Sequence, residues 1–240
     1  MDITSDPVAF AQQLFSSDAT QRHPLGTRAV TTDGRTFRYV KNGATLMATG
    51  KAQQAPAQDT ENDQLTPSAA AIGATSISVT IGTSAAAANA FAGGWAVIDT
   101  TPGQGFSYPI IGHAAIDAST AGTFYLGAPI EVALTTSSRV TLVPNPYNGV
   151  ILAPATTLTG AVVGVAVYPI AANEYGWIGV RGSFGTLIAG TPGVGVAVVL
   201  PGSAAGAVVV DGAAAATQVV GAMQVTGVDG KYLPVLWNLP

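Results

Sequence analysis

"TRAVTTDGRTFRYVKNGATLMATGKA", residues 27–52, carries the clearest strand pattern in the chain. Phe37 and Tyr39 alternate there with Arg38 and Val40, and an alternation of this kind is the period of a β-strand. The segment contains no helical period and many β-branched and aromatic residues. It therefore predicts strands, and it sets the expectation for the rest of the chain.

Two turn dipeptides divide this segment. Asp33-Gly34 and Asn42-Gly43 favour the tight turns of β-hairpins, so we expect two consecutive hairpins or a three-stranded meander. The residues that follow, 52–68, are polar and acidic and include two prolines. They are typical of a linker, a loop or an extended arm.

The remaining chain repeats short apolar runs that are separated by turn residues. Such spacing predicts a β-sandwich or β-barrel. Strands are expected at 76–81, 95–99, 106–111, 123–125 and 139–144, and six more within 160–170, 175–182, 193–202, 206–212, 217–227 and 231–240. We therefore predict an all-β chain with an N-terminal arm (1–68) and two small β-barrel or β-sandwich domains (69–148 and 149–240).

One short helix is expected before the first strand, and it ends at about Ser17. Asp6 is a suitable N-cap and Pro7 suits the first helical position. Isolated helices of fewer than about 12 residues are rarely stable in water, so this one must pack against its own body or a neighbouring subunit. Its apolar face would contain Phe10, Ala11, Leu14 and Phe15.

The composition predicts a surface that is largely covered by protein. Charged residues make up 9% of the 240 residues and hydrophobic residues 48%, against about 25% charged in an ordinary soluble protein. The most apolar run, 161–172, is interrupted by Pro169 and is shorter than the roughly twenty residues of a spanning helix, so we expect no membrane partner. The remaining way to cover the apolar surface is contact between protein subunits, in an oligomer or a lattice.

The residue types that carry chemistry do not form a recognisable motif. His23 and His113 have no second ligand at metal-binding spacing, and Ser183 does not lie in a nucleophile elbow. No phosphate-binding loop occurs, and the carboxylates are scattered, although Asp99 and Asp117 could hold a cation in loops. We therefore expect no enzyme and no cofactor.

Positive charge gathers between Gln21 and Lys51, where six basic residues face one acidic residue, Asp33. Three interpretations are open: nucleic-acid binding with stacking on neighbouring aromatic rings, an ordinary solvated hairpin, or docking on an acidic protein surface through arginine side chains. The overall pI of about 4.9 and the lack of a nucleic-acid motif disfavour the first, so we expect no nucleic-acid partner. We favour the third.

Several segments together resemble a family of tailed-bacteriophage virion proteins, the capsid decoration or cement proteins. The resemblance rests on "HPLGTRAVTTDGRTFRYVKNGATLMATGK" (23–51), "AGGWAVIDTTPGQGFSYPIIGH" (92–113), "PIEVALTTSSRVTLVPNPYNGVI" (129–151), "EYGWIGVRG" (174–182) and the ending from "VVGAMQ" to "YLPVLWNL". It implies a structural protein, often a homotrimer, that binds the major capsid protein on the outer surface of the capsid and is assembled in the host cytoplasm. It supplies no active-site residue.

The prediction from sequence is thus a non-enzymatic capsid decoration protein that stabilises a phage head. The capsid or subunit interface is expected at Phe10, Leu14, Phe15, Arg22, Arg28, Arg35, Phe37, Arg38, Tyr39 and Lys41. The alternative is a head-fibre, tail or host-glycan-binding adhesin protein that displays Trp95, Trp177 or Tyr147 for sugar stacking. A polysaccharide hydrolase is a third possibility and would need two carboxylates in a pocket.

Overall fold

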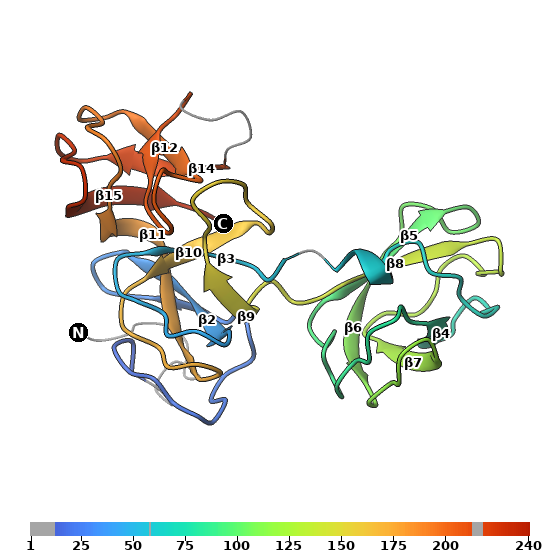
Figure 1. Cartoon of the computed structure of the whole chain (residues 1–240). Coiled ribbons are helices and arrows are strands. Elements are labelled where there is room, and N and C mark those ends of the chain that lie inside the picture. The colour runs from blue at the N-terminus through green and yellow to red at the C-terminus, as the bar shows by residue number, and fades with distance from the viewer. Residues whose placement is uncertain (1–12, 58, 213–217) are drawn as a thin grey trace. The chain divides into compact units, whose positions relative to one another are not determined.

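The computed structural model describes residues 13–57, 59–212 and 218–240, and β-strands dominate these ranges (Figure 1). The all-β prediction is confirmed: fifteen strands and one 3-10 helix, η1 (Thr60–Asn62), lie in the described residues. Within those same ranges no helix is long and apolar enough to cross a membrane.

The short N-terminal helix is not supported. Residues 6–12, including Phe10, lie outside the described residues, and at the other end of the expected helix Leu14 and Phe15 form a turn. Leu14 is buried in the core, whereas Phe15 is 47% exposed. The two side chains therefore do not share the apolar face that the helix would give them.

The chain forms two compact units, and the second is inserted into the first. Unit 1 combines the chain up to Ala57 with Pro146–Pro240, and unit 2 is Gln58–Asn145. This differs from the expected arm followed by two consecutive domains, because the strands of the expected arm belong to the sheet of unit 1. Short-range patterns predict strands but do not reveal which distant strands pair.

Unit 1 contains a small closed barrel of five strands. The order is β2 (Thr36–Asn42), β9 (Asn148–Leu152), β3 (Ala52–Gln54), β10 (Val162–Ala166) and β11 (Tyr175–Leu187), and β11 pairs back with β2. The β2–β9 pair is parallel and the other pairs are antiparallel. Each of the five strands thus has a neighbour on both sides, which removes free sheet edges from the barrel.

Strand β11 is long enough to serve two structures. Its first half pairs with β2 in the barrel, and its second half, from Arg181 to Leu187, pairs with β15 (Tyr232–Asn238). An additional sheet grows from there through β14 (Gln218–Met223), β12 (Ala197–Leu200) and β13 (Val209–Val210), drawn in orange and red in Figure 1. Strand β1 (Arg28–Val30) pairs with β2 and is the edge strand at the opposite end of the strand order from β13.

The opening segment supplies the centre of this core. Phe37 and Tyr39 point into one hydrophobic cluster with Trp177 and Trp237, and all four side chains are 0% exposed. Val40, on the other face of β2, belongs to a second cluster. A strand that is buried on both faces lies inside a packed body, so the alternation of residues 36–42 reflects two apolar surroundings rather than a core side and a solvent side.

One of the two predicted hairpin turns forms. Asp33-Gly34 joins β1 to β2, and Gly34 adopts a φ of 81°, which glycine tolerates. Asn42-Gly43 is not a hairpin turn, because the chain continues to β3, which pairs with β9 and β10 instead of β2. Asn42 is buried, and its amide donates hydrogen bonds to the carbonyls of Thr45, Ile170 and Ala171 at 2.8, 2.8 and 3.0 Å.

Unit 2 is a five-stranded antiparallel sheet. Its order is β4 (Ser76–Thr80), β7 (Ala121–Leu126), β6 (Ser107–His113), β5 (Trp95–Thr100) and β8 (Arg139–Val143), close to the strands expected from sequence. Leu65 pairs with Val140 on one edge strand and Pro67 pairs with Val79 on the other. The segment before the sheet therefore covers both edges.

Candidate functional site

The predicted basic residues of the opening segment lie in unit 1, and most of them already have partners. Arg22 Nε lies 2.7 Å from the Asp18 carboxylate, and an Arg38 guanidinium nitrogen donates to the carbonyl of Gly26 at 3.0 Å. Lys41 Nζ lies 5.8 Å from the centre of the Tyr175 ring. These contacts use the charge locally, as expected for a well-ordered hairpin surface.

Arg28 differs from them. It is exposed at the start of β1, and its side chain makes no hydrogen bond or ion pair with any residue that the structure describes. It remains a candidate for a contact with another molecule.

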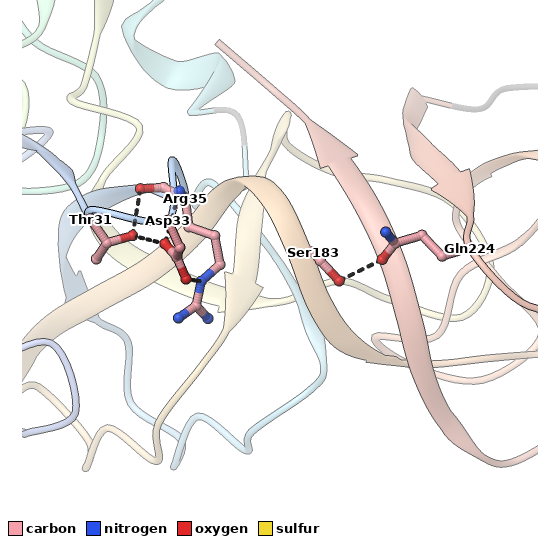
Figure 2. A network of polar contacts seen from close by, with 5 residues as sticks. All are labelled: Thr31, Asp33, Arg35, Ser183 and Gln224. Atoms are coloured by element: carbon pink, nitrogen blue, oxygen red, sulfur yellow. Dashed lines mark hydrogen bonds and ion pairs between the residues drawn. The ribbon is translucent and has the colours of Figure 1, made fainter. Parts of the chain in front are cut away.

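Arg35 is held in place by the turn that precedes it (Figure 2). Its Nε lies 2.8 Å from the Asp33 carboxylate, which also accepts hydrogen bonds from the Thr31 hydroxyl and the Arg35 backbone N–H. The Thr31 hydroxyl, followed by the N–H groups of Arg35, holds the pKa of Asp33 below its ordinary value of 3.8. The guanidinium lies 5.7 and 5.6 Å from the ring centres of Phe37 and Phe184.

A groove of about 590 Å³ opens beside this turn. Its rim includes Gly34 of the β1–β2 turn, and its floor is the outer face of β11, β15 and β14. The side chains that matter for binding are those of Arg181, Val219, Leu236 and Asn238.

The strand register explains why these side chains meet. Arg181 and Asn238 are directly paired across β11 and β15, and Leu236 is paired with Ser183 and with Ala222. Directly paired residues project from the same face of a sheet, and alternate residues of a strand share a face. The outer face of β15 therefore carries Asn238 and Leu236, while Trp237 between them points into the core.

Two glycines also line the groove. Gly182 and Gly221 are both paired with Trp237. Gly182 has a φ of +111°, and a Cβ atom there would lie 2.7 Å from Cγ of Arg35. A larger residue at this position would displace Arg35, so the glycine is needed for close packing of the turn against β11.

The groove combines one available positive charge with apolar surface. Arg181 is exposed, and its side chain makes no ion pair or hydrogen bond within residues 13–57, 59–212 and 218–240. Leu236 and Val219 are 48% and 54% exposed. An arginine fork next to aliphatic surface suits a partner segment that carries a carboxylate beside an apolar side chain.

Three of the predicted interface residues are unavailable to a partner. Leu14, Phe37 and Tyr39 are buried, and burial raises the pKa of the Tyr39 hydroxyl above its ordinary value of 10.0. Phe37 and Tyr39 consequently offer no rings to nucleic-acid bases. Phe15 remains exposed, and Phe10 lies outside the described residues.

The residues considered for catalysis have structural partners. Both ring nitrogens of His113 are engaged, one by the Phe91 backbone N–H at 3.1 Å and the other with the Ala114 carbonyl at 2.7 Å. His23 packs against the rings of Tyr39 and Trp177. Figure 2 shows the hydroxyl of Ser183 donating to the amide oxygen of Gln224.

The same holds for the carboxylates that were considered for a cation. Asp99 accepts hydrogen bonds from the hydroxyls of Thr100 and Thr141, both at 2.8 Å, rather than facing Asp117. Among the residues that the structure describes, no three His, Cys, Asp or Glu side chains are grouped so that they could hold a metal ion.

Arg181, Val219 and Leu236 were not among the interface residues predicted from sequence. The motif "RGSFG" drew attention to its serine, although the informative residue is the arginine that begins it, one of three basic residues after position 63. Comparisons of the chain with protein-family models, with curated proteins and with solved structures gave no match.

Proposed function

We propose that this chain is a non-enzymatic capsid decoration protein that binds the outer surface of a phage head. The observation that carries the proposal is the groove on unit 1. There the Arg181 side chain makes no hydrogen bond or ion pair with a described residue, and Leu236 and Val219 are half exposed. The resemblance of the sequence to virion decoration proteins supplies the identity of the partner, the major capsid protein.

The surface composition supports a partner of protein type. Seventeen large hydrophobic side chains are exposed among the described residues, while only 9% of the whole chain is charged. Large apolar patches on a soluble protein commonly mark interaction sites. Self-association as a homotrimer belongs to the same proposal, and a native mass of about three times 23.9 kDa would support it.

The groove has a definite binding chemistry. The Arg181 guanidinium would pair with a carboxylate of the capsid protein, and Leu236 and Val219 would lose their remaining contact with water. Completing the burial of two half-exposed aliphatic side chains is worth about 1 kcal/mol each. Because the protein binds only the assembled shell, the binding energy at every site stabilises the shell against disassembly.

The test uses shells of the major capsid protein that lack the decoration protein. Arg181→Glu and Leu236→Asp should each reduce occupancy at least tenfold, measured by co-sedimentation and by image reconstruction of the shells. Lys231→Glu and Val194→Asp are matched controls, since both residues are exposed on unit 1 outside the groove. Full occupancy by both groove variants would refute the proposal.

A further inference from the structure

The outer face of the unit 2 sheet carries a continuous row of apolar side chains. We name it the aromatic strip: Trp95, Pro109, Ile111, Tyr125 and Val143, from strands β5, β6, β7 and β8. Trp95 is 46% exposed, Ile111 65%, Tyr125 54% and Val143 40%.

The strand register places these residues next to one another. Trp95 is paired directly with Val143 on one side and with Pro109 on the other. A bulge in β6 follows Ile110, and beyond it Tyr125 is paired with Gly112. Trp95 and Tyr125 are two strands apart, which corresponds to roughly 10 Å across the sheet. Pro109, the partner of Trp95, bonds to Gly127, so Tyr125 is also displaced by two residues, roughly 7 Å, along β7.

Small residues leave the strip open. The partner of Tyr125 on β6 is Gly112, and its partner on β4 is Ser76. Gly127 lies beside Pro109 and Ile111, since a Cβ atom there would be 3.0 and 3.1 Å from their side chains. Gly112 has no side chain to lie against Tyr125, and Trp95 and Tyr125 are 46% and 54% exposed.

The charge of unit 2 restricts what can bind. Unit 2 contains six acidic residues and one basic residue, Arg139, and no charged side chain belongs to the strip. Hydroxyl side chains flank it on the same face, at Ser76, Ser107, Thr123 and Thr141. Asp99 and Arg139 lie on the same face as Thr141, but the carboxylate accepts hydrogen bonds from Thr100 and Thr141. The Arg139 guanidinium donates to the carbonyls of Thr136 and Ser138. A neutral ligand therefore suits the strip better than a charged one.

We propose that the aromatic strip binds a neutral saccharide. The C–H face of a sugar ring stacks on an indole or phenol ring, while its hydroxyls exchange hydrogen bonds with flanking serine and threonine side chains. The spacing of Trp95 and Tyr125 suits a di- or trisaccharide lying across the strands. The binding is non-covalent, and it requires no catalytic group.

The size of the strip favours a small ligand over a protein partner. The exposed parts of its side chains amount to a few hundred Å², below the roughly 800 Å² per partner that a stable protein interface buries. A second copy of the chain on this face is therefore an alternative that the experiment has to separate from saccharide binding.

The test uses the full chain and follows tryptophan fluorescence. Trp177 and Trp237 are 0% exposed, so Trp95 is the tryptophan that soluble saccharides and quenchers can reach. Maltohexaose, cellohexaose, mannohexaose and chitohexaose are titrated, with oligogalacturonate as an acidic comparison. At least one neutral hexaose should shift the emission and protect Trp95 from quenching by acrylamide, and oligogalacturonate should bind at least tenfold more weakly.

Two variants decide whether the strip is the site. Trp95→Ala and Tyr125→Ala should each weaken saccharide binding at least tenfold in calorimetry, whereas Tyr168→Ala, an exposed tyrosine of unit 1, should leave it unchanged. The proposal is overturned if no neutral hexaose binds, if Trp95→Ala binds as well as the parent chain, or if Trp95→Ala changes only the oligomeric mass. Capsid docking through unit 1 is measured separately, so either proposal can fail alone.

Discussion

The buried hydrogen bond between Trp237 and Thr186 allows a quantitative test of the unit 1 core. Trp237 Nε1 donates to Thr186 Oγ1 at 2.9 Å, and both side chains are 0% exposed. Thr186→Val keeps the shape of the side chain but removes the acceptor, which leaves the indole N–H without a partner in an apolar surrounding. An unsatisfied buried donor costs about 1–3 kcal/mol.

The loss is measurable by urea unfolding. Emission from the buried Trp177 and Trp237 reports on unit 1, and with an m value of about 2 kcal/mol/M the midpoint should fall by roughly 0.5–1.5 M. Thr186→Ser retains the hydroxyl and should lose less, about the 0.8 kcal/mol of one buried methyl group. Thr226→Val, in an exposed loop, should change the midpoint little.

A Thr186→Val variant as stable as the parent chain would contradict this role of the Thr186 hydroxyl, and so would equal losses for valine and serine. The first result would mean that the indole N–H finds another acceptor. The second would mean that packing, rather than the hydrogen bond, determines the contribution of this residue.

Two further predictions concern the insertion and the turn beside the groove. Replacing residues 58–145 by a short glycine-rich turn should leave unit 1 folded, since β3 and β9 are paired neighbours; loss of the cooperative tryptophan transition would contradict this. Asp33→Asn should destabilise the chain at about pH 7, and the difference from the parent should vanish as the pH falls below 3.8 and Asp33 itself becomes protonated, because the pKa of Asp33 is lowered by folding. Unfolding midpoints measured across this pH range check the sign, and a difference that grows on acidification would exclude the proposed role of the carboxylate.

The strands of the fold could be predicted from sequence, whereas their pairing could not. Alternation and turn residues located the strands of unit 2 and the six of the last ninety residues, since both patterns are local. The parallel β2–β9 pair joins residues about a hundred positions apart, and nothing near either strand encodes it. Deleting residues 1–51 as a removable arm would accordingly remove β1 and β2 and open the barrel.

The candidate sites likewise combine residues that could be predicted from sequence with residues that only the structure reveals. Arg35 was found because it belongs to a visible cluster of basic residues, but the structure pairs it with Asp33. Arg181 stands alone in the sequence, and only the packing of the β1–β2 turn against β11 reveals its surroundings. Trp95 was considered for stacking together with Trp177 and Tyr147, and burial removes Trp177 from that group.

The insertion of unit 2 between β3 and β9 has a mechanical consequence. A tensile load on unit 2 enters the barrel through two chain segments at once, so each carries part of it. For a pull along the strands, the hydrogen bonds that join β3 to β10 and β9 to β2 resist in shear, and they must break together rather than one after another. Unit 2 is thus attached to the barrel at two points of the chain rather than one.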